Sequence, residues 1–313
     1  MQHDDVKDLA ARLSPLLAGG SADLADLGIG RDTLLALGFD VLGERVKLPE
    51  SAERLDDRLI RQQLDRRADR WLTDLEVLQV VGSTSTLLNE IAAVRSVHGV
   101  VRLAELQLQG RGRRGRGWVS PYANNLALSL GARVPQPTEQ LGGLSLCIGL
   151  AVADRLKTLD VPEVSLKWPN DVLVAGRKIA GILIELHRAG SGSEIVVGVG
   201  VNFRLPPEAR TAIGQPVTDL EEVHGRPSRN LVAAGLISSL VDYIDAFAQA
   251  GFGPMAEAFN GIHHYHGRDC ALLLGNETVM GRVAGVSDRG ELLLEVDGRV
   301  RSFNAGEVSL RPV

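Results

Sequence analysis

The sequence predicts an α+β fold with a large central sheet domain, flanked by a small helical domain and a small β domain. From residue 75 onward, apolar runs rich in Val, Ile and Leu alternate with amphipathic stretches, which is typical of helices packed on a sheet. Residues 266–313 hold short β-type runs separated by turn signals, which predicts a small barrel. The first 50 residues hold short helical patterns instead.

The composition is that of a folded protein with two or three domains. The 313 residues are 44% hydrophobic and 23% charged, and the net charge of -5 argues against bulk binding of nucleic acid. We expect a cytoplasmic protein without a membrane span, because the amino terminus lacks the pattern of a secretion signal and no uncharged apolar run approaches about 18 residues. Cys147 and Cys270 lie in apolar runs and are predicted to be buried thiols.

Four segments follow one another along the chain. Residues 1–50 predict helical pieces at 6–17 and 21–37, broken by glycines, and then a hairpin at 39–48, in the order of a winged helix-turn-helix. The polar residues 51–72 predict an exposed linker helix that bridges two domains. Residues 73–265 form the central domain and residues 266–313 the small β domain.

Within these domains, hydrophobic periodicity places the elements. In the central domain we expect strands at 75–80, 101–108, 126–132, 164–168, 178–186 and 195–201, and helices at 84–96, 144–159 and 230–249. In the β domain we expect strands at 269–274, 277–286, 291–296 and 299–303, with turns at 275–276, 288–290 and 297–298. The histidines at 263, 264 and 266 are interpreted as a domain junction and not as a metal site.

The most informative run is GRGRRGRG at residues 110–117, which ends on Trp118. Glycine lets the backbone approach a ligand closely, and guanidinium groups donate paired hydrogen bonds to phosphate or carboxylate. The run therefore suits a nucleotide anion. A solvated basic loop, an RNA-binding segment and a flexible linker are the alternatives. Its position between two apolar, strand-like runs favours a ligand site.

A second polar motif, KWPND at residues 167–171, follows the apolar run 164–166. A lysine at the end of a strand can place a compact cation beside a phosphate or a developing oxyanion. Asn170 and Asp171 could orient a ligand or hold magnesium. The alternative is an ordinary strand-to-turn transition in which Lys167 is solvated.

These motifs occur in an order that resembles biotin protein ligases, from about residue 75 to residue 313. Besides the two motifs above, the resemblance is carried by 82–85 (GSTS), 105–107 (ELQ), 120–121 (SP), 125–126 (NL), 177–183 (RKIAGIL) with Glu185, 198–202 (GVGVN), 290–294 (GELLL) and 306–311 (GEVSLR).

The resemblance implies a fold and an activity. The central domain would hold a mixed β-sheet like that of class II aminoacyl-tRNA synthetases, followed by an SH3-like barrel and preceded by a winged-helix-like domain. The enzyme would use ATP and Mg²⁺ to convert biotin to biotinyl-5'-AMP. It would then transfer biotin to a lysine of biotin carboxyl carrier protein, a subunit of acetyl-CoA carboxylase, or of another biotin-dependent carboxylase domain. A homodimer is compatible with this family.

The resemblance also implies roles for individual residues. Lys167 and Arg113 would be catalytic, because their charges can stabilise the anionic transition state. Asp171 would assist Mg²⁺ through ATP. The expected biotin contacts are Ser83, Thr84, Ser85, Gln107, Arg111, Gly112, Arg113 and Lys167. The expected nucleotide contacts are Arg111, Arg113, Trp118, Asn170, Lys178 and Asn202.

Two other functions compete with this interpretation. A lipoate or octanoyl ligase of the same superfamily would share the fold and a lysine, but the two motifs and the small β domain favour biotin. A biotin-responsive repressor would need a DNA-binding amino terminus. Residues 23–37 contain Arg31 as their only basic residue, whereas a helix that reads DNA normally carries several. We therefore expect no DNA binding.

Overall fold

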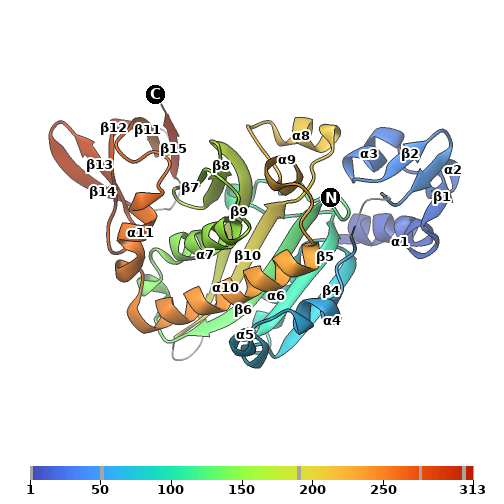
Figure 1. The fold of residues 1–313 in the computed structure, drawn as a ribbon, viewed down its shortest axis with the longest axis horizontal. Helices are drawn as coiled ribbons and strands as arrows, with labels where there is room; N and C mark the ends of the chain where they lie inside the picture. Colours follow the sequence, from blue (N-terminus) through green and yellow to red (C-terminus); the bar gives the residue numbers. More distant parts are fainter. Residues whose placement is uncertain (1–2, 50–52, 189–191, 275–276, 305–307, 313) are drawn as a thin grey trace.

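A seven-stranded mixed β-sheet lies at the centre of the molecule (Figure 1). The computed structural model describes residues 3–49, 53–188, 192–274, 277–304 and 308–312. The strands of the sheet are β4 (Asp74–Val81), β5 (Val100–Gln107), β6 (Asn125–Val134), β7 (Val164–Lys167), β8 (Asp171–Val174), β9 (Arg177–Arg188) and β10 (Ser193–Asn202). Their spatial order is β4-β5-β6-β10-β9-β8-β7, with β4 and β5 parallel and the other neighbouring pairs antiparallel. The predicted large mixed sheet is thus confirmed.

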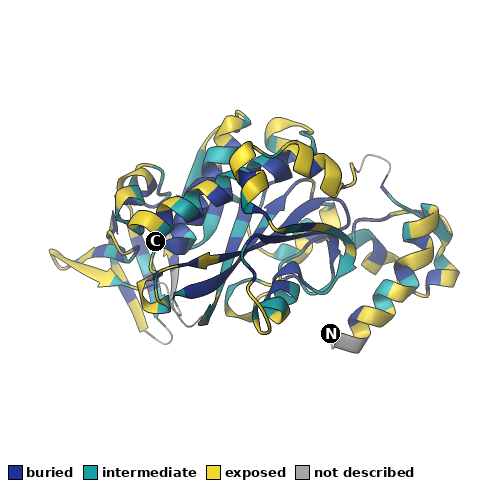
Figure 2. Cartoon of the chain, turned by 90° about the horizontal axis from the view of Figure 1, so that it is seen from below, coloured by how far each residue is buried: buried dark blue, intermediate teal, exposed yellow. Residues whose placement is uncertain are grey.

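Helices cover both faces of this sheet. Helices α7 (Leu144–Thr158) and α10 (Arg229–Ala250) pack together on one face, in one apolar cluster with Ile195 and Val197 of β10. The intervening Val196 belongs to a separate cluster with α6 (Thr84–Ala92), because successive strand residues point to opposite faces. Figure 2 shows buried strands beneath helices whose outer sides are exposed. The sheet therefore carries an apolar core on each side.

Helix α10 is long and apolar enough to cross a membrane by length and composition alone. Half of its most apolar window is nevertheless buried inside the protein, where the helix packs against α7 and β6. Its apolar character is explained by its place in the core. Cys147 of α7 is also buried and unpaired, as predicted, and burial raises the pKa of its thiol.

The expectation that residues 51–72 form one exposed helix was wrong for the described part of this range, residues 53–72. Instead of one exposed helix, the chain forms α4 (Asp57–Gln62) and α5 (Arg66–Trp71), which both pack against α10. Asp56 and Asp65 cap the two helices by accepting hydrogen bonds from backbone amides of their first turns. Among the charges, apolar side chains recur at helical spacing and lie in the main core: Leu55, Ile60, Leu64, Ala68 and Leu72. These few apolar residues pack the segment against α10, although most of its residues are charged or polar.

The amino-terminal module comprises α1 (His3–Gly19), β1 (Ser21–Asp23), α2 (Leu24–Leu27), α3 (Arg31–Ala36), β2 (Asp40–Leu42) and β3 (Arg45–Lys47). The predicted hairpin is present, but residues 21–23 form a strand and not the expected helical start. They pair with β3, so the three strands make a small sheet in the order β1-β3-β2. The core of the module continues into the central domain through Leu106 and Tyr122.

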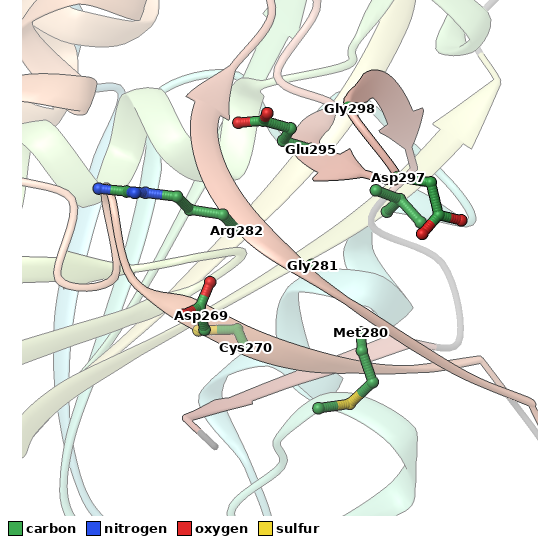
Figure 3. A pocket seen from close by; sticks show the side chains of 9 residues that line it. Asp269, Cys270, Met280, Gly281, Arg282, Glu295, Asp297 and Gly298 are labelled. Atoms are coloured by element: carbon green, nitrogen blue, oxygen red, sulfur yellow. The ribbon is translucent and has the colours of Figure 1, made fainter.

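The carboxy-terminal domain is a five-stranded antiparallel sheet, in which the four expected strands are present and the last strand, at residues 308–312, was not expected. It is reached through η3 (Gly253–Met255) and α11 (Ala256–Gly261). Its strands are β11 (Asp269–Leu274), β12 (Glu277–Val286), β13 (Leu292–Val296), β14 (Arg299–Phe303) and β15 (Val308–Pro312), in the order β14-β13-β12-β11-β15. The turn expected at 275–276 lies outside the described residues. Figure 3 shows a depression on this domain, lined by β11, β12 and the β13–β14 turn.

The junction between the central and carboxy-terminal domains contains a buried histidine. His263 is 5% exposed and packs against Phe259, and neither ring nitrogen has a hydrogen-bond partner in the part of the chain that the structure describes. Burial lowers its pKa from 6.5 to about 3. Among the described residues, no group of three His, Cys, Asp or Glu is arranged to hold a metal.

This histidine should make the protein sensitive to acid. The unfolded chain binds a proton near pH 6.5, whereas the folded chain keeps His263 neutral to about pH 3. The full free energy of unfolding is therefore present above pH 6.5. It decreases as the pH falls, and the loss due to His263 is about 2 kcal/mol at pH 5. We expect His263→Leu to flatten the acid side of the free energy of unfolding measured by denaturant titration, and the exposed control His266→Leu to leave it unchanged. An unchanged acid slope in His263→Leu would contradict this account.

Candidate active site

One large cavity, of about 940 Å³, opens on the central sheet. Its wall is formed by the arginine–glycine loop, the turn between β7 and β8, and the chain around α8 (Pro207–Ile213). Every residue predicted to contact a ligand lines this cavity: Ser83, Thr84, Ser85, Gln107, Arg111, Gly112, Arg113, Trp118, Lys167, Asn170, Asp171, Lys178 and Asn202. Segments that are far apart in the sequence therefore meet around one volume.

A cluster of neutral polar groups lies at one part of the cavity. Gln107 Oε1 accepts hydrogen bonds from Thr84 N at 2.9 Å and Thr84 Oγ1 at 3.1 Å, so this side chain caps α6. The Ser129 hydroxyl lies 2.8 Å from Thr84 Oγ1 and 3.0 Å from Ser85 Oγ. Ser83 occupies the N-cap position of α6, but its side chain makes no capping bond. Buried hydroxyl and amide groups here are positioned to bind a neutral polar ligand.

Trp118 lies across two glycines of the sheet. Gly181 of β9 and Gly200 of β10 are directly paired, and a Cβ atom would lie 2.9 Å from the Trp118 ring at residue 181 and 2.3 Å at residue 200. The indole Nε1 donates to Asn125 Oδ1 at 3.4 Å, and Lys178 Nζ lies 5.4 Å from the ring centroid. The indole is therefore fixed on a flat, glycine-lined part of the cavity floor.

The arginine–glycine segment forms a narrow hairpin. Trp118 N donates to Gly110 O at 2.8 Å, and Gly112 N donates to Arg116 O at 2.8 Å. At the tip, Arg114 and Gly115 both have positive φ, of 58° and 68°, which is the conformation that glycine favours. The hairpin explains why arginine and glycine alternate, because glycine permits the tight backbone while arginine supplies charge.

Two arginines of this hairpin are held by the sheet beneath it. Arg111 Nη1 forms an ion pair with Glu185 Oε1 at 2.8 Å, and Arg113 Nη1 donates to Asn170 Oδ1 at 3.3 Å. Asn170 in turn donates to Ile182 O at 2.9 Å. Burial, followed by repulsion from Arg114, lowers the pKa of Arg113, although an arginine remains charged at neutral pH. The loop is thereby tied to the motif at residues 167–171.

Lys167 is the last residue of β7 and faces the same cavity. Its Nζ lies 5.9 Å from the centroid of the Tyr265 ring, and it forms no ion pair with any of the described residues. Burial lowers the pKa of its ammonium group from 10.5, while Asp171 opposes the shift and Lys178, Arg311 and Arg116 add to it. A half-buried cation among other cations is well placed to bind an anion.

Asp171 does not form a magnesium site by itself. Its Oδ1 lies 2.6 Å from Lys178 Nζ, and both side chains are largely buried. Magnesium prefers several oxygen ligands and water, whereas the surroundings of Asp171 are mainly cationic. These residues do not fit a metal held by protein ligands.

A buried polar network supports the floor of the cavity. Arg229 of α10 forms an ion pair with Glu105 of β5 at 2.7 Å, and its other terminal nitrogen donates to Asn125 O at 2.7 Å. The Asn125 amide then donates to Asn202 Oδ1 at 3.3 Å. Both charged side chains are at least 96% buried, so each charge depends on the other. The network fixes Asn125, which holds the Trp118 indole.

Several residues of the site were not predicted from the sequence. Ser129 lies inside a strand pattern and carries no local signal that separates it from core residues. Gly181 and Gly200 belong to motifs of the resemblance but had no predicted role. Arg311 was part of a motif but had no predicted role, and it lines the cavity from β15. The cavity also includes Thr33 of the amino-terminal module and Ile213 of α8, an element that was not predicted at all.

The fold and the cavity define a protein with a cavity lined by cationic side chains between a sheet and an arginine hairpin. Residues 77–202 match the Biotin/lipoate A/B protein ligase family, and residues 265–311 match the Biotin protein ligase C terminal domain. The chain is 38% identical over 275 residues to Bifunctional ligase/repressor BirA of Salmonella typhimurium, which spans 87% of this chain and 83% of that protein. The chain therefore belongs to the biotin protein ligase family, and the resemblance inferred from the sequence is confirmed.

Two further relatives agree with this membership. The chain is 37% identical over 266 residues to Biotin--[acetyl-CoA-carboxylase] ligase of Mycobacterium tuberculosis, covering 81% of this chain and 95% of that protein. Among solved structures it is similar to the biotin protein ligase from Aquifex aeolicus in complex with biotin and ATP. That similarity has a TM-score of 0.65 and 27% identity, and it covers 77% of this chain and 100% of the other.

The glycine floor beneath Trp118 can be tested without a ligand. Gly200→Ala should destabilise the protein by about 1–3 kcal/mol, because the new methyl group overlaps the indole. Gly261→Ala is the matched control, since no atom lies within 4 Å of the added Cβ. The second substitution Trp118→Leu should recover most of the loss caused by Gly200→Ala in a double-mutant cycle of chemical unfolding. Purely additive effects of the two substitutions would refute the contact.

Proposed function

We propose that this protein is an ATP-dependent biotin protein ligase, which forms biotinyl-5'-AMP and transfers biotin to a lysine of an acceptor protein. The observation that carries the proposal is the convergence of Lys167, Arg111 and Arg113 on one cavity that also holds a neutral polar cluster. Biotin has a carboxylate at one end and a cyclic urea at the other, and the two kinds of site match these ends. The relatives named as biotin ligases support the same activity.

The first half-reaction joins biotin to AMP. A carboxylate oxygen of biotin attacks the α-phosphorus of ATP, the new O–P bond forms, and pyrophosphate leaves with the electron pair of the broken bond. Negative charge gathers on the carboxylate and the phosphate during this step. The ammonium of Lys167 and the guanidinium of Arg113 stabilise that charge, since both are already positioned before the ligand arrives.

In the second half-reaction, a neutral lysine amine of the acceptor attacks the carbonyl carbon of the mixed anhydride. The new C–N bond replaces the C–O bond to phosphate, AMP leaves with the electron pair, and the amine loses a proton. Lys167, which lines the cavity, is again the candidate to stabilise the oxyanion and the departing phosphate. The arginine hairpin over the cavity limits access of water to the anhydride.

The neutral polar cluster favours biotin over lipoate. The groups around the ureido position are predicted to be Ser83, Thr84, Ser85 and Gln107, and Ser129 joins them through hydrogen bonds. A cyclic urea supplies donors and an acceptor for the remaining hydrogen-bonding capacity of such groups, whereas the dithiolane ring of lipoate supplies neither. The match to the biotin ligase C-terminal domain points the same way.

The nucleotide would lie toward Trp118, Asn170, Lys178 and Asn202. Asn202 donates to Thr218 O at 3.0 Å, which joins this strand end to the chain that follows α8. Magnesium would enter with ATP as a counter-ion of its phosphates, and the acceptor would be biotin carboxyl carrier protein or a related carboxylase domain. Asp171, which pairs with Lys178, could then act on magnesium only through ATP and not as a protein ligand of the metal. The residue roles and the possible homodimer stay predictions.

We also propose the domain assignments made from the sequence: a winged-helix-like module at 1–50, a linker at 51–72, a synthetase-like catalytic domain at 73–265 and an SH3-like barrel at 266–313. The strand and helix order of the amino-terminal module supports the first of these. DNA binding is not part of the proposal. Acidic residues outnumber basic ones by eight to five in residues 1–49. The two terminal nitrogens of Arg31 donate hydrogen bonds to the carbonyl oxygens of Val41 and Gly43. A cytoplasmic location stays a prediction.

The test is transfer of radiolabelled biotin to a biotin carboxyl carrier domain in the presence of ATP and Mg²⁺. Wild-type protein should label the carrier, and Lys167→Met should slow adenylate formation on the order of 100-fold or more, as for other lost oxyanion donors. The exposed Lys157, on the outer surface of α7, provides the control Lys157→Met, which should retain full activity. Labelling by lipoate in place of biotin would overturn the substrate assignment.

The lowered pKa of Lys167 predicts a limit to activity at high pH. The ammonium form is present below this pKa and is lost as the pH rises through it, so kcat/KM for adenylate formation should begin to decline at a pH below that of an ordinary lysine. Lys167→Arg should move this decline to higher pH, because arginine stays protonated, even though the maximum rate is lower. A decline at the same pH in both proteins would show that another group is responsible.

A further inference from the structure

The amino-terminal module is not separate from the cavity. Thr33 and Ala36 of α3, together with the following Leu37, line the same volume as Lys178 and Asn202. Figure 1 shows α3 beside α8, and the two helices are in contact. Neither helix belongs to the motifs that carry the family resemblance. The cavity is therefore closed on this side by elements that the motif analysis left without a function.

The module is fixed firmly to the central domain at this point. Tyr122 N donates to Leu37 O at 2.7 Å, and the rings of Phe39 and Tyr122 stack with centroids 5.3 Å apart. Tyr122 is 1% exposed and belongs to the core of the module. At Gly38 a Cβ atom would lie 2.9 Å from the Asn124 side chain, so the two surfaces are in close contact. The position of α3 beside the cavity is thus set by packed, buried contacts.

Helix α8 is held from the other side by ion pairs. Arg210 of α8 lies 2.5 Å from Asp219 and 3.0 Å from Glu222, and Glu222 also pairs with Arg177 of β9. Asp219 is 3% exposed, so its pairing with Arg210 is partly shielded from water. In the segment between Arg210 and Asp219, the side chains of Ile213 and Val217 line the cavity. Helix α8 is therefore fixed at its base while its end borders the cavity.

The position of this segment identifies the half of the cavity that it borders. Lys178 N donates to Pro216 O at 3.1 Å, and Thr218 N donates to Lys178 O at 3.0 Å. The segment thus runs beside Lys178, whose ammonium lies over the Trp118 ring. The neutral cluster of Thr84 and Gln107 belongs to other elements, α6 and β5. Helix α3 contacts α8, and through it borders the part of the cavity that contains Lys178 and Trp118.

We propose that α3 of the amino-terminal module forms a wall of the nucleotide half of the cavity, where Ala36 limits the space available to the nucleotide. The proposal rests on the proposed function only in naming ATP as the ligand of that half. Ala36 is small and half-buried, so a larger side chain at this position would project into space that the nucleotide needs. The module then has a role in ligand binding, set by packing and independent of any DNA.

The variant Ala36→Trp tests this role in the full-length protein. Titration calorimetry should show ATP binding weakened about tenfold or more, with biotin binding unchanged, because the ureido half is left intact. Asp32→Trp is the matched control, since Asp32 lies on the same helix, is exposed and does not line the cavity. It should bind both ligands as the wild type does. If Ala36→Trp lowers the thermal unfolding midpoint, Ala36→Leu gives the same comparison with a smaller side chain and should show a smaller loss of ATP affinity.

The two proposals can fail separately. Wild-type protein that binds ATP but transfers no biotin would overturn the proposed function. The ATP titrations of Ala36→Trp and Asp32→Trp would still test whether α3 borders the ATP site. Equal ATP affinity of wild type, Ala36→Leu and Ala36→Trp would contradict the proposal that Ala36 limits the space for the nucleotide, even where biotin transfer is intact. Equal weakening of biotin and ATP binding in Ala36→Trp would also overturn it, because the wall would then not be confined to the nucleotide half.

Discussion

The site depends on positive charges that the fold holds close together and partly out of water. Lys167, Arg113 and Lys178 surround one cavity, where Asp171 forms an ion pair with Lys178 and lies close enough to oppose the lowering of the pKa of Lys167. Bringing like charges together in a poorly solvated place opposes folding, and the lowered pKa values of Lys167 and Arg113 reflect this cost. A bound carboxylate and phosphate would supply the missing negative charge, so the same feature that strains the free protein favours its ligand.

The sheet makes this arrangement possible because it contributes a flat floor. Gly181 and Gly200 face each other on neighbouring strands and leave room for Trp118, and at Gly198 a Cβ would lie 2.6 Å from Ser85 Oγ. Side chains at these positions would fill the cavity. Beneath the floor, the buried pair of Glu105 and Arg229 joins the sheet to α10, and its hydrogen bonds reach Asn125 under the indole. The catalytic surface and the core are therefore one connected structure.

Much of the site was predictable, because its residues occur in short runs whose chemistry is local. The hairpin at 110–117 and the motif at 167–171 both indicate cationic side chains beside a turn. Their order along the chain is similar to the order in biotin protein ligases. The expectation of one exposed helix at residues 51–72 failed because charge density outweighed five apolar residues at helical spacing. Strand β8 and helix α8 lie between the expected elements and were not predicted.

The sequence by itself determined which side chains carry the chemistry, since charge, hydroxyl groups and glycine are properties of single residues. It also determined the alternation of strands and helices, through hydrophobic periods of two and 3.6. Only the tertiary structure decided what lies beside them: Arg311 reaches the cavity from the last strand, and Ala36 reaches it from the amino-terminal module. Such contacts depend on how whole domains pack, and no pattern within either segment encodes the distance to the other.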